Sequence, residues 1–488
     1  MLQFSDIWQA IIDAAGKTPA ALADQPISAV VVDSRAAQPG ALFVALRGEK
    51  TDGHLYLADA FGRGAVAALA EPRALELGLN ATFVMPDGAV RAAPAQTAAA
   101  PYVFIVPDSL GGLQKLAATW RERMPAVAVG ITGSVGKTTT KEIVANVLEQ
   151  RYTTHRNEGN LNNEIGLPLT LLKLTPQVQR IVLEMGMYEL GEIASLCRLA
   201  KPRIGIVTNV GPTHLERLGS IERIAQAKSE LVQALPSADV GGVAILNADD
   251  PLVRAMASRT SARVFTYGLD ESSDLWADEI SSEGLEGIRF RFNYRKEILH
   301  VHLPMLGRHS VHTALRAAAA GLVEGLSWTE ILAGLQHQRG QLRLMAVPGL
   351  RGTMVIDDTY NASPASMLAA LNLLEEIVND SHRAVVVLGE MLELGSYEEE
   401  GHRLVGGRAA QVAAKLVTVG SRGRWIAEEA LAAGMKSTDV HPAANNNDAI
   451  AVLLGLIQPG DIVLVKGSRG LAMESIVDAL AETAESKS

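Results

Sequence analysis

The sequence is poor in cysteine and contains no long hydrophobic run. Cys197 is the single cysteine among 488 residues, which excludes an internal disulfide framework and fits a reducing compartment. We expect its side chain to pack as a small apolar group in a helix. The N-terminus, Met1 to Trp8, carries Asp6 and lacks the basic start and apolar run of a signal peptide. No apolar stretch reaches the roughly 18 residues that span a bilayer. These absences predict a soluble, cytoplasmic protein without membrane insertion.

Positive charge is also scarce. Lysine and arginine number 44 against 54 aspartates and glutamates, which gives a net charge of -10. A nucleic-acid-binding face needs lysine and arginine clustered over a surface, so we expect no nucleic-acid partner. Any anionic ligand must therefore be bound by a local positive site. We expect the chain to act as a monomer.

The length and the apolar pattern predict three α/β domains. A chain of 488 residues exceeds what one hydrophobic core usually organises, and a composition of 48% hydrophobic and 20% charged residues is typical of globular proteins. Apolar runs within residues 30–46 and 64–70 predict a small N-terminal α/β domain over residues 1–107. Residues 71–101, rich in Ala, Pro and Gly, predict a loop insertion in that domain, with a turn at Met85 to Gly88.

From residue 126 onward, apolar strand candidates alternate with amphipathic helix candidates. This alternation predicts parallel sheets covered by helices on both faces. Because the pattern starts afresh after residue 340, we place a central parallel-sheet domain at 108–340 and a Rossmann-like C-terminal domain at 341–488. The predicted strands are 127–131, 181–184, 204–209 and 243–247 in the central domain, and 354–357, 384–388, 416–419 and 462–465 in the C-terminal domain.

The first of these strands runs into a Gly-rich turn and then a helix. Glycines let backbone N–H groups curl around phosphate oxygens, and the following helix N-terminus favours anions. Lys137 can reach the β and γ phosphates, and Thr138 can bind Mg²⁺. The strict Walker spacing requires glycine where Ile131 stands, so this is the shorter Thr-Gly-Ser-x-Gly-Lys-Thr form of the phosphate loop (P-loop). It predicts a nucleoside triphosphate site made by Gly133, Ser134, Val135, Gly136, Lys137, Thr138 and Thr139.

This loop resembles that of the Mur ligase family, which adds amino acids to the peptide of a UDP-linked cell-wall precursor. The resemblance covers nearly the whole chain. It implies magnesium ligands at Glu184, in Leu183 to Gly186, and at His214, in Thr208 to Leu215. Both follow strand candidates, where open α/β sheets place ligands. Without the P-loop, Glu184 would be interpreted as a solvated strand end and His214 as a loop histidine.

The resemblance also implies a modified lysine. Lys228, in the phrase Ala225 to Glu230, matches the family lysine that carbon dioxide converts to a carbamate. An ammonium cannot bind Mg²⁺, whereas carbamate oxygens can hold a second ion. The alternative is a solvated helix lysine.

Other phrases match segments around the nucleotide. Asn247 and His309 lie in segments that resemble those enclosing the adenine, although the family carries asparagines where Ser310 and Thr313 stand; His309 could instead pack or cap a helix. Arg343 and Asp358 match positions where the third domain closes over ATP, an arrangement that stabilises phosphoryl charge and excludes water. The alternative for Asp358 is a helix cap before Pro364.

Three longer phrases, at 157–168, 358–364 and 387–395, resemble one branch of the family, which joins D-alanyl-D-alanine to UDP-N-acetylmuramoyl-tripeptide. The residues implied on the UDP-substrate side are Ser34, Arg35, Gly48, Asp52, His54, Asn160, Asn162 and Asn163, which in the N-terminal segment could also be ordinary turns. Those implied on the dipeptide side are Tyr360, Asn361, Lys466 and Ser468.

The implied reaction consumes ATP and Mg²⁺. The peptide carboxylate attacks the γ phosphorus, and the dipeptide amine then attacks the acyl phosphate to form the amide. Two alternatives remain. The tripeptide-forming branch shares the fold and the ATP site, but its diaminopimelate-adding members carry an Asp-Asn-Pro-Arg phrase absent from residues 341–488. A P-loop switch protein would explain Gly133 to Thr139, but not Lys228 or the third domain.

Overall fold

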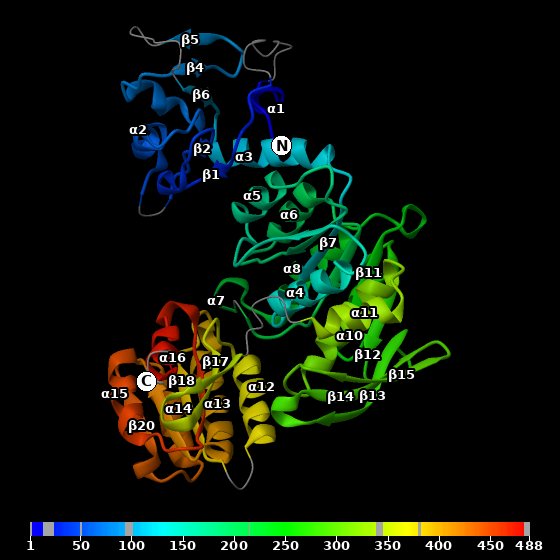
Figure 1. Ribbon diagram of the computed structural model, residues 1–488, viewed down its shortest axis with the longest axis vertical. Helices are drawn as coiled ribbons and strands as arrows, with labels where there is room; N and C mark the ends of the chain where they lie inside the picture. Colours follow the sequence, from blue (N-terminus) through cyan, green and yellow to red (C-terminus); the bar gives the residue numbers. More distant parts are fainter. Residues whose placement is uncertain are drawn as a thin grey trace. The chain divides into compact units, whose positions relative to one another are not determined.

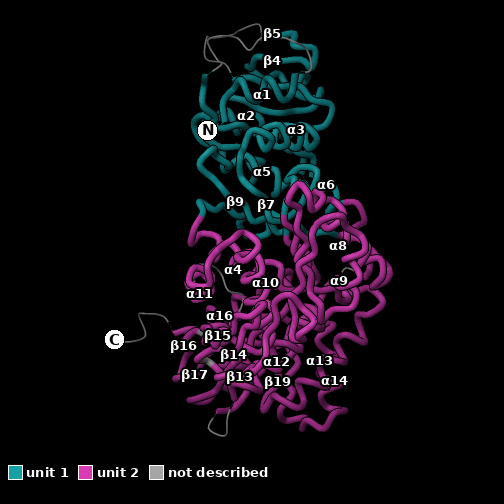
Figure 2. The backbone as a smooth tube through the Cα atoms, turned by 90° about the vertical axis from the view of Figure 1, so that its right-hand side faces the viewer, with its two compact units in different colours: residues 1–130, 152–187, 192–203 teal, residues 131–151, 188–191, 204–488 magenta. Residues whose placement is uncertain are grey.

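The computed structural model describes residues 2–12, 24–48, 51–92, 101–213, 215–337, 345–378 and 382–482 (Figure 1). Within this described part, the strands form three sheets, one in each of three α/β domains, as the sequence predicted. Close packing divides the chain into two compact units (Figure 2): unit 1 holds residues 1–130, 152–187 and 192–203, and unit 2 the remainder. The domain limits at 107/108 and 340/341 remain predictions.

The first sheet has six strands in the order β1-β2-β3-β6-β4-β5 and is parallel except for β5. The apolar runs form its central strands, and Phe4 of α1 lies 5.3 Å, centroid to centroid, from Phe104 of β6. The elements are α1 (Phe4–Ile11), β1 (Val30–Val31), β2 (Leu42–Val44), α2 (Leu57–Gly62), β3 (Ala67–Ala70), β4 (Thr82–Val84), β5 (Val90–Ala92), β6 (Tyr102–Ile105) and α3 (Ser109–Glu122).

The predicted loop insertion at 71–101 is wrong for its described residues. A short 3-10 helix, Pro72–Glu76, is followed by β4 and β5, and β4 pairs in parallel with β6 inside the sheet. The turn signal itself is confirmed: Gly88 N–H donates to the Met85 carbonyl at 2.9 Å, which closes the β4–β5 hairpin. Three-residue strands in an Ala-, Pro- and Gly-rich segment carry too little periodicity to reveal a sheet. Residues 93–100 lie outside the described part.

The second sheet has nine strands in the order β15-β14-β13-β12-β11-β10-β7-β9-β8. All four strands predicted in this region form, with boundaries shifted by up to two residues. The strands are β7 (Val127–Thr132), β8 (Thr154–Arg156), β9 (Arg180–Glu184), β10 (Ile204–Val207), β11 (Val243–Asn247), β12 (Arg263–Gly268), β13 (Leu275–Ser282), β14 (Ile288–Tyr294) and β15 (Glu297–Leu303). The helices are α4 (Lys137–Leu148), α5 (Gly166–Leu172), α6 (Glu192–Ala200), α7 (Leu215–Leu218), α8 (Ile221–Gln233), α9 (Pro251–Arg254), α10 (Ser310–Val323) and α11 (Trp328–Gln336).

This sheet is mixed, whereas the sequence predicted parallel strands alone. β10 to β13 are parallel neighbours, but β14 is antiparallel to both β13 and β15. In β14 the side chains of Ile288, Phe290 and Phe292 are buried and alternate with more exposed Arg289 and Arg291. That period of two is the mark of an antiparallel strand with one solvated face.

The third sheet has the order β16-β17-β21-β18-β19-β20 and is parallel except for β16. All four strands predicted here form. The strands are β16 (Met345–Gly349), β17 (Thr353–Asp358), β18 (Ala384–Gly389), β19 (Lys415–Val419), β20 (Val440–Ala443) and β21 (Ile462–Lys466). The helices are α12 (Pro364–Ile377), α13 (Glu398–Val412), α14 (Gly423–Ala432), α15 (Asn446–Leu456) and α16 (Glu474–Leu480).

Two hydrophobic cores cover the two faces of this third sheet. Val386 and Leu388 of β18 pack with residues of α12, α13 and α14, and Val385 and Val387 pack with residues of α15 and α16. Because both faces of β18 are buried, its sequence is a continuous apolar run. Polar side chains therefore collect where the strands end, at the carboxyl edge of the sheet.

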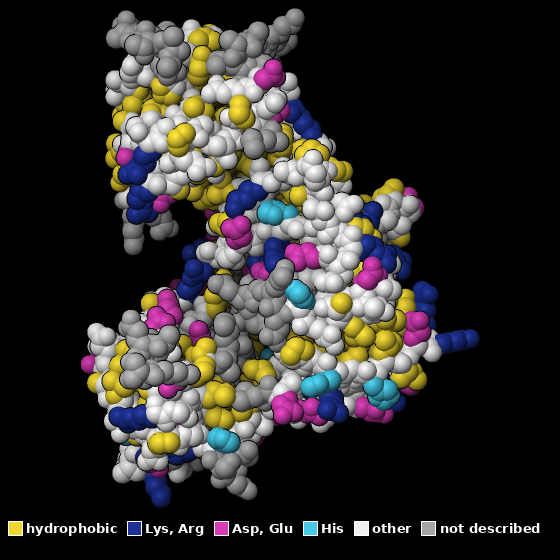
Figure 3. Space-filling view, in the orientation of Figure 1, with side chains coloured by type: hydrophobic (Ala, Val, Ile, Leu, Met, Phe, Trp, Pro, Cys, Tyr) yellow, Lys and Arg dark blue, Asp and Glu magenta, His cyan; other side chains and the backbone are white. Residues whose placement is uncertain are grey.

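Charged side chains of both signs lie intermixed on the face of the molecule in Figure 3. In the C-terminal domain, Arg403 bonds Glu399 at 2.8 Å, and Arg408 bonds Glu375 at 2.5 Å. Such solvent-exposed pairs contribute about 0–1 kcal/mol each, so they affect solubility more than the fold.

Candidate functional site

The P-loop takes a shape that only glycine permits at two positions. Gly133 has φ 149°, and a Cβ added to it would overlap Thr208 Oγ1. Gly136 has φ 81°, in the left-handed region, and is the N-cap of α4. The Gly-rich motif thus turns the chain from the end of β7 directly into a helix N-terminus.

The segment after β10 holds the P-loop in place. Asn209 accepts from the Ser134 N–H through its carbonyl, at 3.0 Å, and from the Val135 N–H through its side chain, at 2.9 Å. Ser134 Oγ donates to the Gly211 carbonyl at 3.0 Å. The N–H groups of Ser134 and Val135 are therefore directed at the protein.

The N–H groups at the start of α4 follow one turn later in the chain. The first intrahelical bond of α4 runs from the Thr140 N–H to the Gly136 carbonyl, so the N–H groups of Lys137, Thr138 and Thr139 precede the helical ladder. Lys137 Nζ donates to the Gly133 carbonyl at 2.9 Å, which holds the ammonium over the loop. Helix N-terminus and ammonium together favour a bound phosphate.

Lys228 is a buried lysine in the same unit as the P-loop. It lies in α8, and its side chain is 2% exposed. Burial, and secondarily the nearby positive charge of Lys137, lower the pKa of Lys228 well below its usual value. A neutral amine is the form that attacks carbon dioxide, so the environment of Lys228 fits a carbamate and argues against a solvated helix lysine.

Glu184 ends β9 in unit 1 and is also buried. Asn157 holds its backbone: the Asn157 side chain accepts from the Glu184 N–H at 2.9 Å and donates to its carbonyl at 3.1 Å. Asn162 Nδ2 donates to Glu184 Oε1 at 2.9 Å. Both asparagines come from the segment before α5, which therefore fixes the orientation of the carboxylate. The alternative of a solvated strand end is wrong.

The segments predicted to enclose the adenine lie around β11 and α10. Asn247 is buried, donating from Nδ2 to the Thr208 carbonyl at 3.1 Å and accepting from the Asp249 N–H. His309 occupies the N-cap position of α10, but its side chain makes no capping hydrogen bond. His312 Nε2 lies 2.7 Å from Asp249 Oδ2, which links α10 to the segment after β11.

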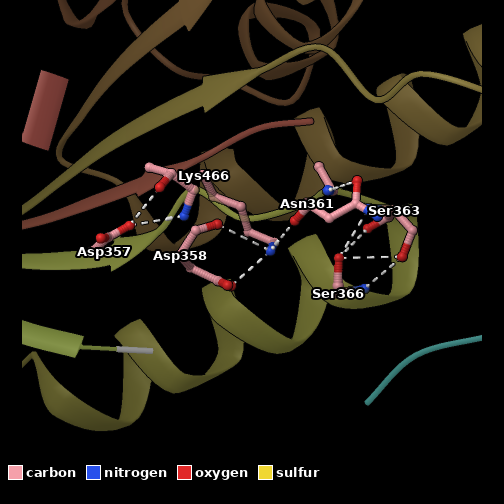
Figure 4. A network of polar contacts seen from close by, with 8 residues as sticks. Asp357, Asp358, Asn361, Ser363, Ser366 and Lys466 are labelled. Atoms are coloured by element: carbon pink, nitrogen blue, oxygen red, sulfur yellow. Dashed lines mark hydrogen bonds and ion pairs between the residues drawn. The ribbon is translucent and has the colours of Figure 1, made fainter. Parts of the chain in front are cut away.

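A buried ion pair stands at the carboxyl edge of the third sheet (Figure 4). Lys466 Nζ lies 2.7 Å from Asp358 Oδ2 and donates to the Asn361 carbonyl at 2.8 Å. Asp358 and Lys466 are 6% and 2% exposed. The alternative of Asp358 as a helix cap is wrong, because Ser363 caps α12 in a reciprocal capping box with Ser366.

A second polar cluster follows β18 on the same sheet. Glu390 accepts from the N–H and guanidinium of Arg422 and from Ser421 Oγ. Although burial raises a carboxyl pKa, these bonds hold the pKa of Glu390 below its usual range. Ser468 Oγ accepts from the Leu392 N–H at 2.9 Å, and Arg469 lies over the Tyr360 ring. The residues predicted for the dipeptide side thus lie at the ends of two neighbouring strands, β17 and β21, and the Glu390 cluster lies at the end of β18 beside them.

In the N-terminal domain, Asp52 and His54 form one unit. Asp52 Oδ1 lies 2.7 Å from His54 Nδ1, and His54 Nε2 accepts from the Glu71 N–H at 2.9 Å. Both nitrogens of this buried ring are used within the domain, so we expect its part in substrate binding to be indirect. Arg35 is exposed and bonds Asp33 at 2.6 Å.

Comparison with known proteins gives three family matches along the chain. The Mur ligase family, catalytic domain, matches residues 26–121, the Mur ligase middle domain matches 131–321, and the Mur ligase, glutamate ligase domain, matches 342–469. The chain belongs to the Mur ligase family.

Relatives and solved structures of Mur ligases agree over nearly the whole chain. The UDP-N-acetylmuramoyl-tripeptide–D-alanyl-D-alanine ligases of Mycobacterium tuberculosis and Bacillus subtilis are 37% and 35% identical, covering 92% and 94% of this chain and 91% and 94% of their own. A crystal structure of MurF from Acinetobacter baumannii superposes with a TM-score of 0.81 at 29% identity, covering 97% of each chain. MurF of Thermotoga maritima in complex with ADP superposes with a TM-score of 0.76 at 27% identity, covering 93% of this chain and 97% of its own.

Two residues predicted from the Mur ligase resemblance, His214 and Arg343, lie outside the described residues. In the described part of the chain, no group of three or more His, Cys, Asp or Glu side chains lies together as metal ligands. The predicted magnesium ligands Thr138 and Lys228 are of other types. No described helix of this Mur ligase combines the length and apolar character needed to cross a bilayer.

Several residues that hold the candidate site in place carry no recognisable motif in the sequence. Asn157 and Asn209 hold Glu184 and the P-loop, yet neither was assigned a role. Each is a polar side chain within two residues of a strand end, at Arg156 and Val207, and that position was the available signal. Arg316, a buried arginine in α10, carried no motif signal.

Proposed function

We infer that this Mur ligase joins D-alanyl-D-alanine to UDP-N-acetylmuramoyl-tripeptide, with ATP as the energy source, in the synthesis of the peptidoglycan precursor. The observation that carries this conclusion is the 35–37% identity to ligases of that reaction over more than nine tenths of both chains. The P-loop, with its helix N-terminus and Lys137, supplies the ATP site that the reaction requires. Use of ATP and the single cysteine support a cytoplasmic location.

Product analysis tests this function directly. The protein is incubated with ATP, Mg²⁺, UDP-N-acetylmuramoyl-tripeptide carrying lysine or diaminopimelate, and D-alanyl-D-alanine, and the products are identified by mass. We expect ADP, phosphate and a UDP-pentapeptide, and no amide when any one component is omitted. Extension of a dipeptide precursor by a single amino acid would favour the tripeptide-forming branch. Phosphate release that is equally fast without both peptides would favour a nucleotide switch.

Phosphoryl transfer is the first step. The N–H groups at the start of α4 and the ammonium of Lys137 bind the phosphates, which leaves the γ phosphorus open to the peptide carboxylate. The new P–O bond forms as the bond to ADP breaks. The dipeptide amine then attacks the acyl carbon, loses its proton, and the C–O bond breaks to release phosphate.

Magnesium would be held by Thr138, Glu184, His214 and the carbamate of Lys228. Bound there, Mg²⁺ would neutralise phosphate charge during transfer, and two ions need the extra anionic ligand that a carbamate provides. The buried carboxylate of Glu184, fixed by Asn162, and the lowered pKa of Lys228 support this assignment. In carbamate formation the neutral Lys228 nitrogen bonds the carbon of CO₂ and releases one proton.

The remaining assignments follow the three domains. In the central domain, Asn247 and His309 would contact the adenine. In the C-terminal domain, Arg343 and Asp358 would close over ATP, and the incoming dipeptide would meet Tyr360, Asn361, Lys466 and Ser468. The UDP end of the substrate would be bound by Ser34, Arg35, Gly48 and Asp52, together with Asn160, Asn162 and Asn163, and His54 would act indirectly by holding Asp52. The clustering of Asp358, Asn361 and Lys466 at one sheet edge supports the C-terminal part of this assignment.

A further inference from the structure

Arg316 is a buried arginine that lies against the P-loop. It is on α10, whose residues pack on α4, and its side chain is 4% exposed. A Cβ added to Gly136 would lie 3.6 Å from Arg316 Nη2 and 3.7 Å from Nη1. The guanidinium therefore sits beside the residue at which the loop becomes the N-terminus of α4.

The hydrogen bonds of Arg316 position its guanidinium but do not offset its positive charge. Nη2 donates to Thr313 Oγ1 at 2.8 Å, and the guanidinium also bonds the buried hydroxyl of Tyr267. That hydroxyl donates in turn to the Thr208 carbonyl at 3.3 Å, next to Asn209. Both partners of the arginine are neutral. Thr313 stands at one of the two positions where this chain departs from the asparagines of the family pattern.

The positive charge of Arg316 has no counterion within the described part of the chain. Among the residues that the structure describes, no carboxylate forms an ion pair with it, and its Nε is buried without an acceptor. An arginine stays protonated in proteins, and an isolated buried charge is costly unless an anion accompanies it. Lys137 follows Gly136 directly, so a second cation adjoins the same glycine. A bound anion would offset both charges.

We propose that Arg316 is an additional nucleotide-binding residue, whose guanidinium contributes positive charge to the binding of the ATP polyphosphate at the P-loop. Phosphate is the anion that the N–H groups of an α-helix N-terminus and a planar guanidinium both favour. The residue therefore strengthens binding of ATP and ADP and not of adenosine. This inference rests on the proposed ATP site and goes beyond it, because no part of the P-loop motif includes α10.

Arg316→Met tests the proposal, since methionine keeps much of the side-chain volume and removes the charge. The dissociation constants of ATP, ADP and adenosine are measured by titration, and the melting temperature without nucleotide by calorimetry. We expect ATP and ADP to bind about tenfold to a hundredfold more weakly, as the loss of a hydrogen-bonded charge implies, with adenosine unchanged. The melting temperature should stay the same or rise, because an unmatched buried charge is removed.

Arg121→Met is the matched control. Arg121 is also buried, but its three donating nitrogens bond the carbonyls of Ala200, Met124 and Ala126. Its loss should lower the melting temperature and leave the ATP constant unchanged. If Arg316→Met instead lowers the melting temperature in the same way and leaves ATP binding intact, Arg316 is structural and the proposal is wrong. Equal weakening of ATP and adenosine would assign Arg316 to the base and contradict it too.

Thr313→Val provides a milder variant. It removes the 2.8 Å bond to Arg316 but keeps the shape of the side chain. We expect the preference for ATP over adenosine to fall less than it does in Arg316→Met. If the preference is unchanged in both Thr313→Val and Arg316→Met, the proposal is wrong. If the wild-type protein fails to bind ATP, the proposed function fails first, and the two failures are thereby distinguished.

Discussion

Asp358 and Lys466 are register partners at the carboxyl ends of β17 and β21, and their side chains form an ion pair of 2.7 Å although they lie 108 residues apart in sequence. Parallel pairing brings the two strand ends together, and the short loop after β17 adds the Asn361 carbonyl as a further acceptor. The pair joins a residue proposed to face ATP to one proposed to face the dipeptide. It would therefore couple the two halves of the reaction within one domain.

Removing one member of this pair should destabilise the C-terminal domain. Asp358→Asn removes the carboxylate that is paired at 2.7 Å with the buried ammonium of Lys466, which we expect to cost about 3–5 kcal/mol. Hydrogen exchange of the β17 and β21 amides measures the local free energy of opening. The control is Arg408→Met, which breaks the pair with Glu375 on the surface and should cost at most about 1 kcal/mol. Equal effects of the two variants would contradict the buried pair.

Gly133→Ala should abolish ATP binding. The added methyl group overlaps Thr208, so the loop must move away from the segment that holds it. Titration with ATP should show no saturation, while circular dichroism should show that the domain folds. Gly78→Ala is a matched control: Gly78 also has positive φ, 64°, but open space around its Cβ. It should cost about 1 kcal/mol of stability and leave ATP binding intact. Binding by Gly133→Ala at wild-type strength would refute the loop geometry.

Lys228 gives the unfolding free energy a specific pH dependence. Its pKa is lowered in the folded state, so below the ordinary lysine value of 10.5 the unfolded chain binds a proton that the folded chain does not. The resulting loss of stability grows as pH falls below 10.5 and levels off below the folded-state pKa. In buffer free of carbon dioxide, Lys228→Met should therefore be more stable than wild type at pH 7, with the difference shrinking toward pH 10.5. Urea unfolding at several pH values measures this.

The same lysine should respond to carbon dioxide. Adding bicarbonate at neutral pH should raise the melting temperature and the ligase rate of the wild-type protein, since the carbamate replaces a buried amine with an anion beside Lys137. Lys228→Met should show neither response and little activity. Lys201→Met, which removes an exposed lysine bonded to Glu122, should behave like wild type. Normal turnover by Lys228→Met would contradict the assignment of a carbamate to Lys228.

Asn162→Leu should change the magnesium requirement. Asn162 Nδ2 donates to Glu184 Oε1 at 2.9 Å, and loss of that bond removes one restraint on the orientation of the carboxylate. Residues that orient metal ligands typically affect metal affinity by 10–100-fold, so the Mg²⁺ concentration for half-maximal rate should rise about tenfold or more. Asn372→Leu, at a surface asparagine bonded to Arg408, is the control and should leave it unchanged. A wild-type Mg²⁺ dependence in Asn162→Leu would remove Asn162 from the site.

The predicted strands were recoverable from sequence because each is buried on both faces. The sequences of β11 and β18 are apolar runs. Asn247 is the last residue of β11, and Glu390 directly follows β18. β4 and β5 were not predicted because three residues show no period, and β13 to β15 were not predicted because their buried residues alternate with exposed ones and form no continuous apolar run. The course of the P-loop from strand through turn to helix was predictable, since it is encoded locally in sequence, whereas its nucleotide contacts remain predictions.

The contacts between the other site residues could not be predicted, because they depend on pairing between distant segments. The Asp358–Lys466 contact requires the strand order β17-β21-β18, which no local motif encodes. The position of Arg316 could not be predicted for the same reason. An arginine in an alanine-rich helix matches no motif, and only the packing of α10 places it beside Gly136.

If the peptide carboxylate is activated as an acyl phosphate before the amide forms, oxygen-18 placed in that carboxylate must appear in the phosphate that is released. The labelled UDP-tripeptide is incubated with the protein, ATP, Mg²⁺ and D-alanyl-D-alanine, and the phosphate released is analysed by mass. We expect one labelled oxygen in the phosphate for each amide formed, since the carboxylate oxygen that attacks the γ phosphorus leaves with it. If the released phosphate is unlabelled, and is released equally fast without either peptide, then no acyl phosphate forms on the peptide carboxylate.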